Sequence, residues 1–165
     1  MQQVDSFVNP PTNRDSETLM KLINDHEDVS EYLEVLEEIL GFLHEEEAWS
    51  QVKQIEDFFK RVISHFEFEE KTVFPGVLSE YATSETIKLI LELQKEHGII
   101  LKELEEFQKI ISENTIPLDK EMNARLNVVG RGIIDRFLTH ASKEDDELLP
   151  ILQKNRQIFG LPDEN

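Results

Sequence analysis

Apolar residues recur at intervals of three and four along most of the chain, which predicts amphipathic helices. The first helix is expected to begin after an N-cap at Ser16 and to run to about Glu46. The second is expected to begin near Trp49 or Ser50 and to end at Phe74-Pro75-Gly76, because proline interrupts the helical hydrogen bonds. No stretch alternates apolar and polar residues for long enough to predict a strand.

Two further helices complete the pattern. The third begins at Thr83 or Ser84, either of which can cap it, and ends within the segment 112–117. The fourth is expected to run from about Leu118 to Leu149-Pro150. Every predicted element is a helix, so the predicted fold class is all-α. Short connections place consecutive helices next to one another.

The predicted architecture is an antiparallel up-down-up-down four-helix bundle, in which each helix buries one apolar stripe in a shared core. The bundle is expected over residues 16–152, between an N-terminal arm at 1–15 and a C-terminal tail at 153–165. A chain of 165 residues is long enough for one domain with a substantial core.

The composition narrows the classes of function. There are 17 Lys and Arg against 35 Asp and Glu, a net charge of -18, so neither nucleic acid nor an anionic membrane surface is an expected partner. No apolar run approaches the roughly 20 residues of a membrane span. The absence of cysteine excludes disulfides and thiolate metal sites. The N-terminus shows no secretory signal pattern, which predicts a cytoplasmic protein.

The chain contains an internal repeat. The second predicted helix matches the fourth when the sequence is shifted by 75 residues, and the first matches the third at a shift of 71. Apolar matches follow from shared helical periodicity, but polar matches do not. The polar residues that keep register include four histidines and two glutamates: His26, His65, Glu69, His97, His140 and Glu144.

These histidines are predicted to share one layer of the bundle. With a rise of 1.5 Å per residue, each lies roughly 15 to 20 Å from the same end. The positions three, four and seven residues from each histidine are largely apolar, so each imidazole faces the core. Glu69 and Glu144 follow His65 and His140 by one turn, which directs both carboxylates into the core beside the imidazoles.

A buried layer of this composition predicts a metal site, because each ionised carboxylate loses several kcal/mol of hydration unless a cation compensates it. Nitrogen and oxygen donors without sulfur suit iron, manganese or zinc. Two carboxylates among four histidines suggest two metal ions, each bound by two imidazoles and bridged by Glu69 and Glu144. Open coordination positions would admit dioxygen, peroxide or nitric oxide. Apolar side chains are expected to form a dry wall around the site: Phe58, Phe66, Leu93, Leu101 and Phe137.

The motif His-x-x-x-Glu occurs at 65–75 and again at 140–150, each time with two apolar residues and a proline eight to ten residues after the histidine. With His26 and Glu96-His97, these segments resemble the hemerythrin-like family of cation-binding domains over about residues 16–152. The resemblance implies a non-haem di-iron site, in which the four histidines are terminal ligands and the two glutamates are bridges. Members of that family include oxygen carriers, oxygen or iron sensors, and proteins that repair iron–sulfur clusters.

The sequence departs from the oxygen carriers of that family at two places. They have a further ligand histidine one turn from His97, where this chain has Leu93 and Leu101. They place an aspartate five residues after the last histidine, where this chain has Asp145 directly after Glu144. Glu144 is favoured, because four residues turn only about 40° from the face of the histidine. The cluster-repair members carry a cysteine-bearing segment, and this chain has no cysteine.

The leading interpretation is a di-iron protein that binds dioxygen or a related small oxidant for storage, sensing or stress response. One alternative is an enzyme acting on peroxide or nitric oxide, or an iron donor in iron–sulfur cluster repair. Another is an interaction module in which the metal only stabilises the bundle. Ferritin-type oxidases are disfavoured, because apolar Val62 and Phe137 stand where their Glu-x-x-His motif needs glutamate. His44, about 27 Å along the helix from His26, is expected outside the site. No protein partner follows from the sequence.

Overall fold

The structure is a computed structural model that describes residues 13–46, 49–115 and 117–154. All regular structure in these residues is helical, which confirms the all-α fold class. The helical elements, of which η2 and η3 are π-helical, follow in chain order: α1 Asn13–Leu40, α2 Trp49–Phe68, η2 Glu69–Val73, α3 Phe74–Glu80, α4 Ser84–Glu113, α5 Lys120–Lys143, η3 Glu144–Leu148 and α6 Leu149–Lys154.

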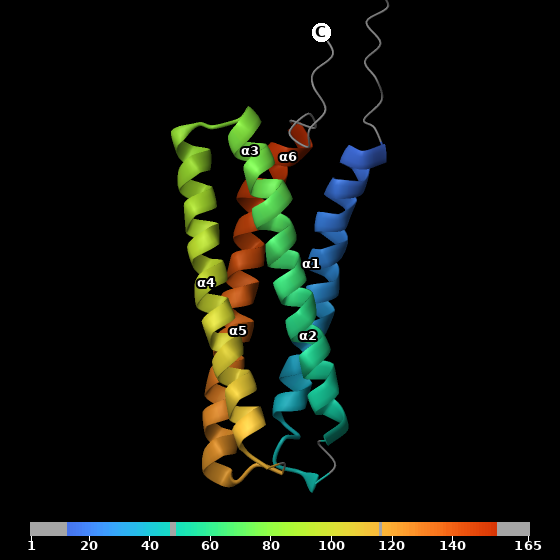
Figure 1. Cartoon of the computed structure of the whole chain (residues 1–165), viewed down its shortest axis with the longest axis vertical. Helices are drawn as coiled ribbons and strands as arrows, with labels where there is room; N and C mark the ends of the chain where they lie inside the picture. The colour runs from blue at the N-terminus through green and yellow to red at the C-terminus, as the bar shows by residue number, and fades with distance from the viewer. Residues whose placement is uncertain (1–12, 47–48, 116, 155–165) are drawn as a thin grey trace, which may run out of the picture.

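These elements form a helical bundle of four rods (Figure 1). Two rods are the single helices α1 and α4, and the other two are the continuous runs α2–η2–α3 and α5–η3–α6. In Figure 1 the chain turns back at the lower end after α1 and α4, and at the upper end after α3. Helix α1 packs against α2 and α5, and α4 packs against α2, α3 and α5. Within the described residues, no helix combines the length and apolar character that a membrane crossing requires.

Two helices continue through the prolines at which they were predicted to end. In an α-helix the Pro75 ring would meet the carbonyl four residues earlier. Here a π turn precedes each proline: the Phe74 N–H donates to the Glu69 carbonyl, and the Leu149 N–H donates to the Glu144 carbonyl. These bonds span five residues instead of four, so the backbone before each proline leaves the α-helical ladder and the rod continues.

The other helix ends differ less from the predictions. Helix α1 begins at Asn13, so Ser16 lies inside it and the predicted N-cap there is wrong. It ends at Leu40 rather than near Glu46, and the Leu43 carbonyl in the following turn accepts a hydrogen bond from the Leu118 N–H. Thr83 is confirmed as the cap of α4, because its hydroxyl accepts from the Thr86 N–H and the Thr86 hydroxyl accepts in return from the Thr83 N–H. Most of the predicted arm and tail, residues 1–12 and 155–165, lies outside the described residues.

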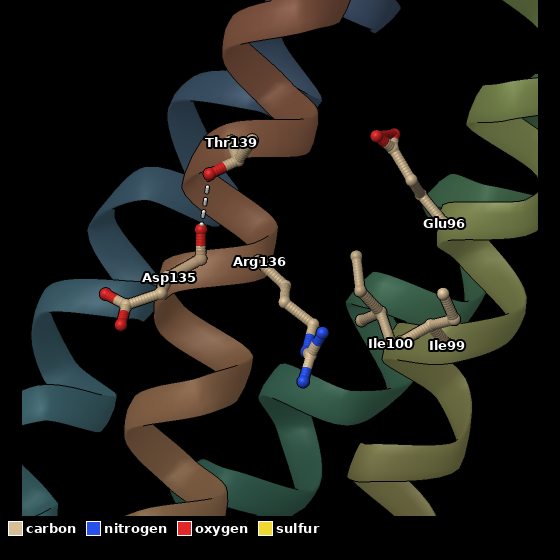
Figure 2. Close-up of a pocket in the computed structure, with 6 residues that line it drawn as sticks. All are labelled: Glu96, Ile99, Ile100, Asp135, Arg136 and Thr139. Carbon is tan, nitrogen blue, oxygen red and sulfur yellow. Dashed lines mark hydrogen bonds between the residues drawn. The ribbon is translucent and has the colours of Figure 1, made fainter.

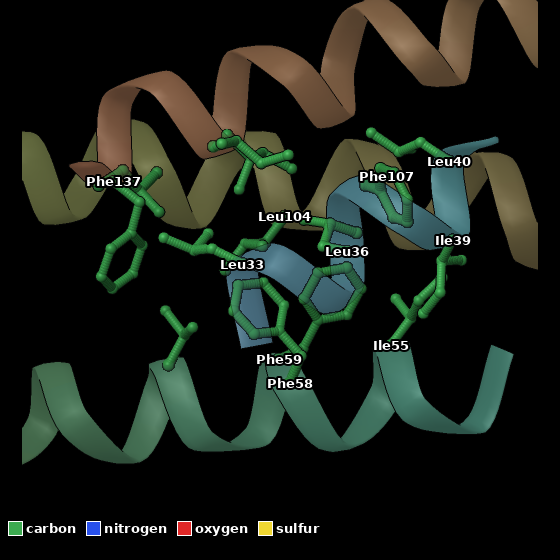
Figure 3. Close-up of a cluster of buried hydrophobic side chains, with 14 of the residues drawn as sticks. Leu33, Leu36, Ile39, Leu40, Ile55, Phe58, Phe59, Leu104, Phe107 and Phe137 are labelled. Atoms are coloured by element: carbon green, nitrogen blue, oxygen red, sulfur yellow. The ribbon is translucent and has the colours of Figure 1, made fainter. Parts of the chain in front are cut away.

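Two apolar clusters fill the bundle, and they are named here for their place in Figure 1. The lower cluster, shown in Figure 3, includes Leu33, Leu36, Ile39, Leu40, Ile55, Phe58, Phe59, Leu104, Phe107 and Phe137. The upper cluster consists of Leu22, Val73, Phe74, Val77, Leu89, Ile90, Leu93, Leu148 and Leu152. On α4, for example, His97 falls between Leu93 of the upper cluster and Ile100 of the lower cluster. The polar layer is therefore enclosed by apolar packing on both sides.

A close approach of α5 to α1 and α4 gives a test of the core packing. A Cβ atom on Gly130 would lie 2.6 and 2.8 Å from the two methyl carbons of Leu40 and 3.1 Å from the Phe107 ring. Gly130→Ala is therefore expected to destabilise the protein by about 1–2 kcal/mol, because overpacking outweighs the better helix propensity of alanine. Gly132→Ala is the matched control, since its Cβ would meet no atom closer than 3.8 Å. Chemical denaturation should rank the control as the more stable variant, and equal stabilities would contradict this packing.

Candidate metal centre

One histidine from each rod and the first residue of each π turn meet in the polar layer. They are His26 on α1, His65 on α2, His97 on α4, His140 on α5, Glu69 in η2 and Glu144 in η3. Both glutamates and three of the histidines are buried, and only the His26 side chain, at 13% exposure, reaches solvent. On the side of α1 the layer therefore reaches solvent through His26.

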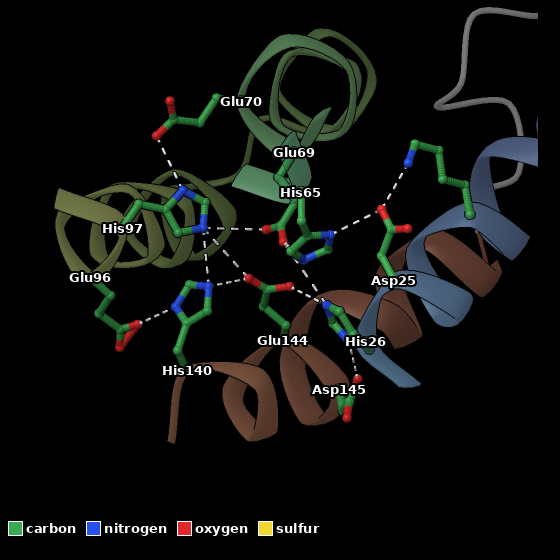
Figure 4. Close-up of polar contacts among 11 residues, drawn as sticks. Asp25, His26, His65, Glu69, Glu70, Glu96, His97, His140, Glu144 and Asp145 are labelled. Atoms are coloured by element: carbon green, nitrogen blue, oxygen red, sulfur yellow. Dashed lines mark hydrogen bonds and ion pairs between the residues drawn. The ribbon is translucent and has the colours of Figure 1, made fainter. Parts of the chain in front are cut away.

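The inner ring nitrogens and the two carboxylates converge on the bundle axis (Figure 4). The Nε2 atoms of His97 and His140 are 3.0 Å apart, and the Nε2 atom of His26 is 2.8 Å from Oε2 of Glu144. Glu144 also contacts His140, one turn earlier on its own rod. Glu69 likewise contacts His65 on its own rod, and its Oε2 atom is 3.5 Å from Nε2 of His97.

These donor atoms form two groups that share both glutamates. The first group adds His26 and His65 to the two carboxylates, and the second adds His97 and His140. Within each group, one donor atom from every residue lies within 4.8 Å of the others. This spacing brings two sets of four nitrogen and oxygen donors close enough to surround a cation each.

The two buried carboxylates have pKa values shifted in opposite directions. Burial raises the pKa of Glu69 well above its usual range, and the adjacent Glu144 carboxylate raises it further. Burial would also raise the pKa of Glu144, but hydrogen bonds from the histidines, led by His140, hold it well below its usual range. Burial would lower the pKa of His26 and of His97, yet hydrogen bonds to Glu144 outweigh it and raise both. Glu144 is therefore the carboxylate that favours its charged form, whereas the pKa shifts of Glu69, His26 and His97 favour their protonated forms.

The donor set fits a cation better than it fits these protons alone. Four buried atoms lie against other groups of the cluster but make no hydrogen bond of normal geometry, namely Nε2 of His65, both carboxylate oxygens of Glu69, and Oε1 of Glu144. A buried polar atom without a well-formed hydrogen bond costs up to about 1–3 kcal/mol. A cation bound among them would give every one of these atoms a partner and would neutralise both carboxylates.

Comparison with protein families agrees with this geometry. The model of the hemerythrin HHE cation binding domain matches residues 17–152. The chain belongs to the hemerythrin HHE cation-binding family. No curated protein and no solved structure matches it. The family match confirms the resemblance drawn from the repeated histidine and glutamate motifs.

Aromatic rings cover the histidines of this hemerythrin-family centre. Phe66 stacks on His97 with ring centroids 3.8 Å apart, and Phe137 stacks on Phe66 and meets His140 edge-on. Phe74, which the sequence analysis did not select, stacks on His97 from the other cluster at 5.6 Å. Phe74 was not selected because it directly precedes Pro75, where the helix was expected to end.

The remaining predicted wall residues lie in the adjoining packing. Phe58 contacts Tyr32 and Phe59 in the lower cluster. Leu93 is fully buried in the upper cluster, and Leu101 is partly buried against the lower one. Their assignment to the wall of the hemerythrin-like centre stays a prediction. His44 is exposed beyond the end of α1, outside both donor groups.

Four acidic residues that the sequence analysis did not assign to the site contact the outer ring nitrogens of the histidines: Asp25, Glu70, Glu96 and Asp145. Asp145 therefore lies outside the donor groups, against Nδ1 of His26, while Glu144 points into the centre. A sequence signal for these acids exists, because each is directly adjacent in sequence to one of the six inner residues.

Two surface pockets occupy equivalent places on the two halves of the hemerythrin fold. One, of about 230 Å³, is lined by Asp25 and His65 between α1 and α2. The other, of about 280 Å³, is lined by Glu96 and Arg136 between α4 and α5 (Figure 2). Both pockets bring solvent up to an acid that contacts a buried histidine.

Proposed function

We propose that the chain binds two non-haem iron ions and that the loaded centre binds dioxygen or a related small oxidant. The observation that carries the proposal is the pair of donor groups sharing Glu69 and Glu144. In this assignment each iron takes two imidazoles, and the two carboxylates bridge the irons. Their equivalence under the sequence repeat supports two similar metal positions within a single antiparallel up-down-up-down bundle.

The donor chemistry supports iron, with manganese or zinc as the other ions that such a site accepts. Imidazole and carboxylate donors suit all three, and the absence of cysteine leaves no thiolate to favour a softer ion. Among these ions, iron supplies the redox change that reversible binding of dioxygen requires.

The residues of the chain perform three tasks in this function. The four Nε2 atoms would hold the metals from the four rods, and Glu69 and Glu144 would be shared between the two metal positions. With four protein donors in each group, further coordination positions stay open for a small ligand. Phe66, Phe74 and Phe137 exclude water from the side of His97 and His140.

Metal analysis combined with absorption spectroscopy tests the proposal. The protein purified with iron is expected to contain about two irons per chain, and to show bands that disappear on reduction and return when oxygen is readmitted. Loading with zinc should give the same stoichiometry without those bands. Fewer than one iron per chain would contradict the centre, whereas irreversible consumption of added peroxide would favour the enzyme alternative.

A second function is favoured by the position of the cluster. The six residues come from all four rods, so a bound cation would link every rod of the bundle. Binding to the folded chain alone stabilises it by about 2.7 kcal/mol at 100 times the dissociation constant. If zinc and iron stabilise the chain equally and iron shows no response to oxygen, the centre serves as a structural metal site of an interaction module.

A further inference from the structure

Each of the four histidines of the centre has a carboxylate on its outer nitrogen. The distances from Nδ1 to the nearest carboxylate oxygen are 2.9 Å for His26, 3.2 Å for His65, 3.2 Å for His97 and 3.1 Å for His140. A carboxylate accepts hydrogen bonds, so the ring nitrogen facing it must carry the hydrogen. All four imidazoles therefore carry a hydrogen on the outer side.

The four acids form a closed circuit around the bundle (Figure 4). Asp25 on α1 accepts from the α2 histidine, and Glu70 in η2 accepts from the α4 histidine. Glu96 on α4 accepts from the α5 histidine, and Asp145 in η3 accepts from the α1 histidine. Each rod thus gives one carboxylate to the next rod and receives one from the previous rod.

Each acid of this circuit is adjacent in sequence to one of the six inner residues. Asp25 precedes His26 and Glu96 precedes His97, while Glu70 follows Glu69 and Asp145 follows Glu144. Adjacent helical residues point about 100° apart, so when one faces the bundle axis the other faces the neighbouring rod. One pair of positions on each rod therefore supplies both an inner donor and an outer acceptor for the next rod.

The four acids fall into two classes that follow the repeat. Asp25 and Glu96 act within their own helical hairpin and are held by lysines, with Lys21 Nζ 2.9 Å from Asp25 and Lys143 Nζ 2.6 Å from Glu96. Glu70 and Asp145 act between the two hairpins and are about half exposed. The first class fixes a histidine against its partner helix, and the second class joins the hairpins across the centre.

We propose that the four outer acids are positioning residues, an inference that rests on the proposed metal function. They hold the hydrogen of each imidazole on Nδ1, present the Nε2 lone pair to the metal, and add negative charge that favours the oxidised state of the centre. Carboxylates placed in this way on metal-binding histidines fix the tautomer and raise the basicity of the ligand. The residues are Asp25, Glu70, Glu96 and Asp145.

The first test uses the metal-free protein and does not depend on iron. Two-bond correlation spectra of the ¹⁵N-labelled imidazoles at mildly alkaline pH are expected to show a hydrogen on Nδ1 of all four histidines. In Glu96→Ala the hydrogen of His140 should move to Nε2, whereas Glu96→Gln should keep it on Nδ1, because the amide oxygen still accepts. Glu92→Ala is the matched control, because Glu92 lies one turn away and forms an ion pair with the same Lys143.

The second test separates the hydrogen bond from the charge in the iron-loaded protein. Glu96→Ala is expected to lower iron affinity 10- to 100-fold in a chelator competition, the range for loss of such an outer partner. Glu96→Gln should keep most of the affinity but raise the reduction potential, because one negative charge near the iron is lost. Glu92→Ala should change neither quantity.

The two proposals fail in distinguishable ways. If the wild-type chain binds no iron while its histidines still carry hydrogen on Nδ1, the proposed function fails and the orienting role of the acids stands. If the chain binds iron but Glu96→Ala leaves both the His140 tautomer and the iron affinity unchanged, the acids are only surface ion pairs. Asp145→Ala, with exposed Asp146→Ala as its control, repeats the test between the two hairpins.

Discussion

Iron binding is expected to be lost when both shared carboxylates are replaced, in the double variant Glu69→Gln, Glu144→Gln. Each glutamate belongs to both donor groups, so the variant removes half of the donors from each group. Loss of a single outer partner already costs 10- to 100-fold in metal affinity, and loss of two direct ligands is expected to cost more than about 100-fold. Iron analysis after dialysis against a weak chelator should therefore find about two irons in the wild type and essentially none in the variant.

The matched control is the double variant Glu67→Gln, Glu147→Gln. Both residues are exposed on the same two rods, within three residues of the shared carboxylates. The control removes the same charge from the chain and should retain full iron content. Equal iron content in the two double variants would show that the metal binds to the acidic surface rather than to the buried layer.

The largest expected loss of stability from one substitution is that of Phe66→Ala. Phe66 is 2% exposed and stacks on both His97 and Phe137, so its removal opens a cavity between the polar layer and the lower cluster. Truncation of a buried phenylalanine costs about 3–5 kcal/mol, through lost burial and the cavity that remains. Denaturant unfolding of the metal-free protein, compared at constant m-value, measures this loss directly.

Ile63→Ala provides the comparison on the same helix, because the Ile63 side chain is 43% exposed. It should change the unfolding free energy by only about 0.5 kcal/mol. Should Phe66→Ala be as mild as this control, the ring would not be the packed link between the histidines and the core. A Phe66→Leu variant, which refills part of the cavity, is expected to fall between the two.

The position of the polar layer between two apolar clusters affects the stability of the bundle. Apolar clusters above and below it supply the burial that holds the rods together, while the layer itself contains buried polar atoms that lack a hydrogen bond of normal geometry. Such atoms lower the stability of the metal-free chain. The chain therefore gives up stability at one level of the bundle in order to present a ready-made set of donors to a cation.

The repeat and the helical period predicted the positions of the six inner residues before any coordinates. A rise of 1.5 Å per residue and a turn of 100° fix height and direction along a helix, so His65 and Glu69 could be placed together from their spacing alone. The same reasoning placed His44 too far along the chain to join them. The helical class followed equally directly, because the apolar spacing admits no other regular structure.

The π turns at Glu69 and Glu144 could not be predicted from the helical period. A π turn places one extra residue in a helix, and the apolar pattern tolerates that shift without a visible break. Proline was therefore interpreted as an end at Pro75 and Pro150, although the widened turn before each lets the rod continue.

Periodicity along one helix determines which residues face the core, and that much the sequence decided alone. Contacts between helices depend on how neighbouring rods are rotated and offset, and no spacing within one helix contains that information. The tertiary structure alone therefore decided that Asp145 meets His26 and that Glu70 meets His97. For the same reason the inner donors could be predicted from the sequence, whereas the acids that orient them required the packed bundle.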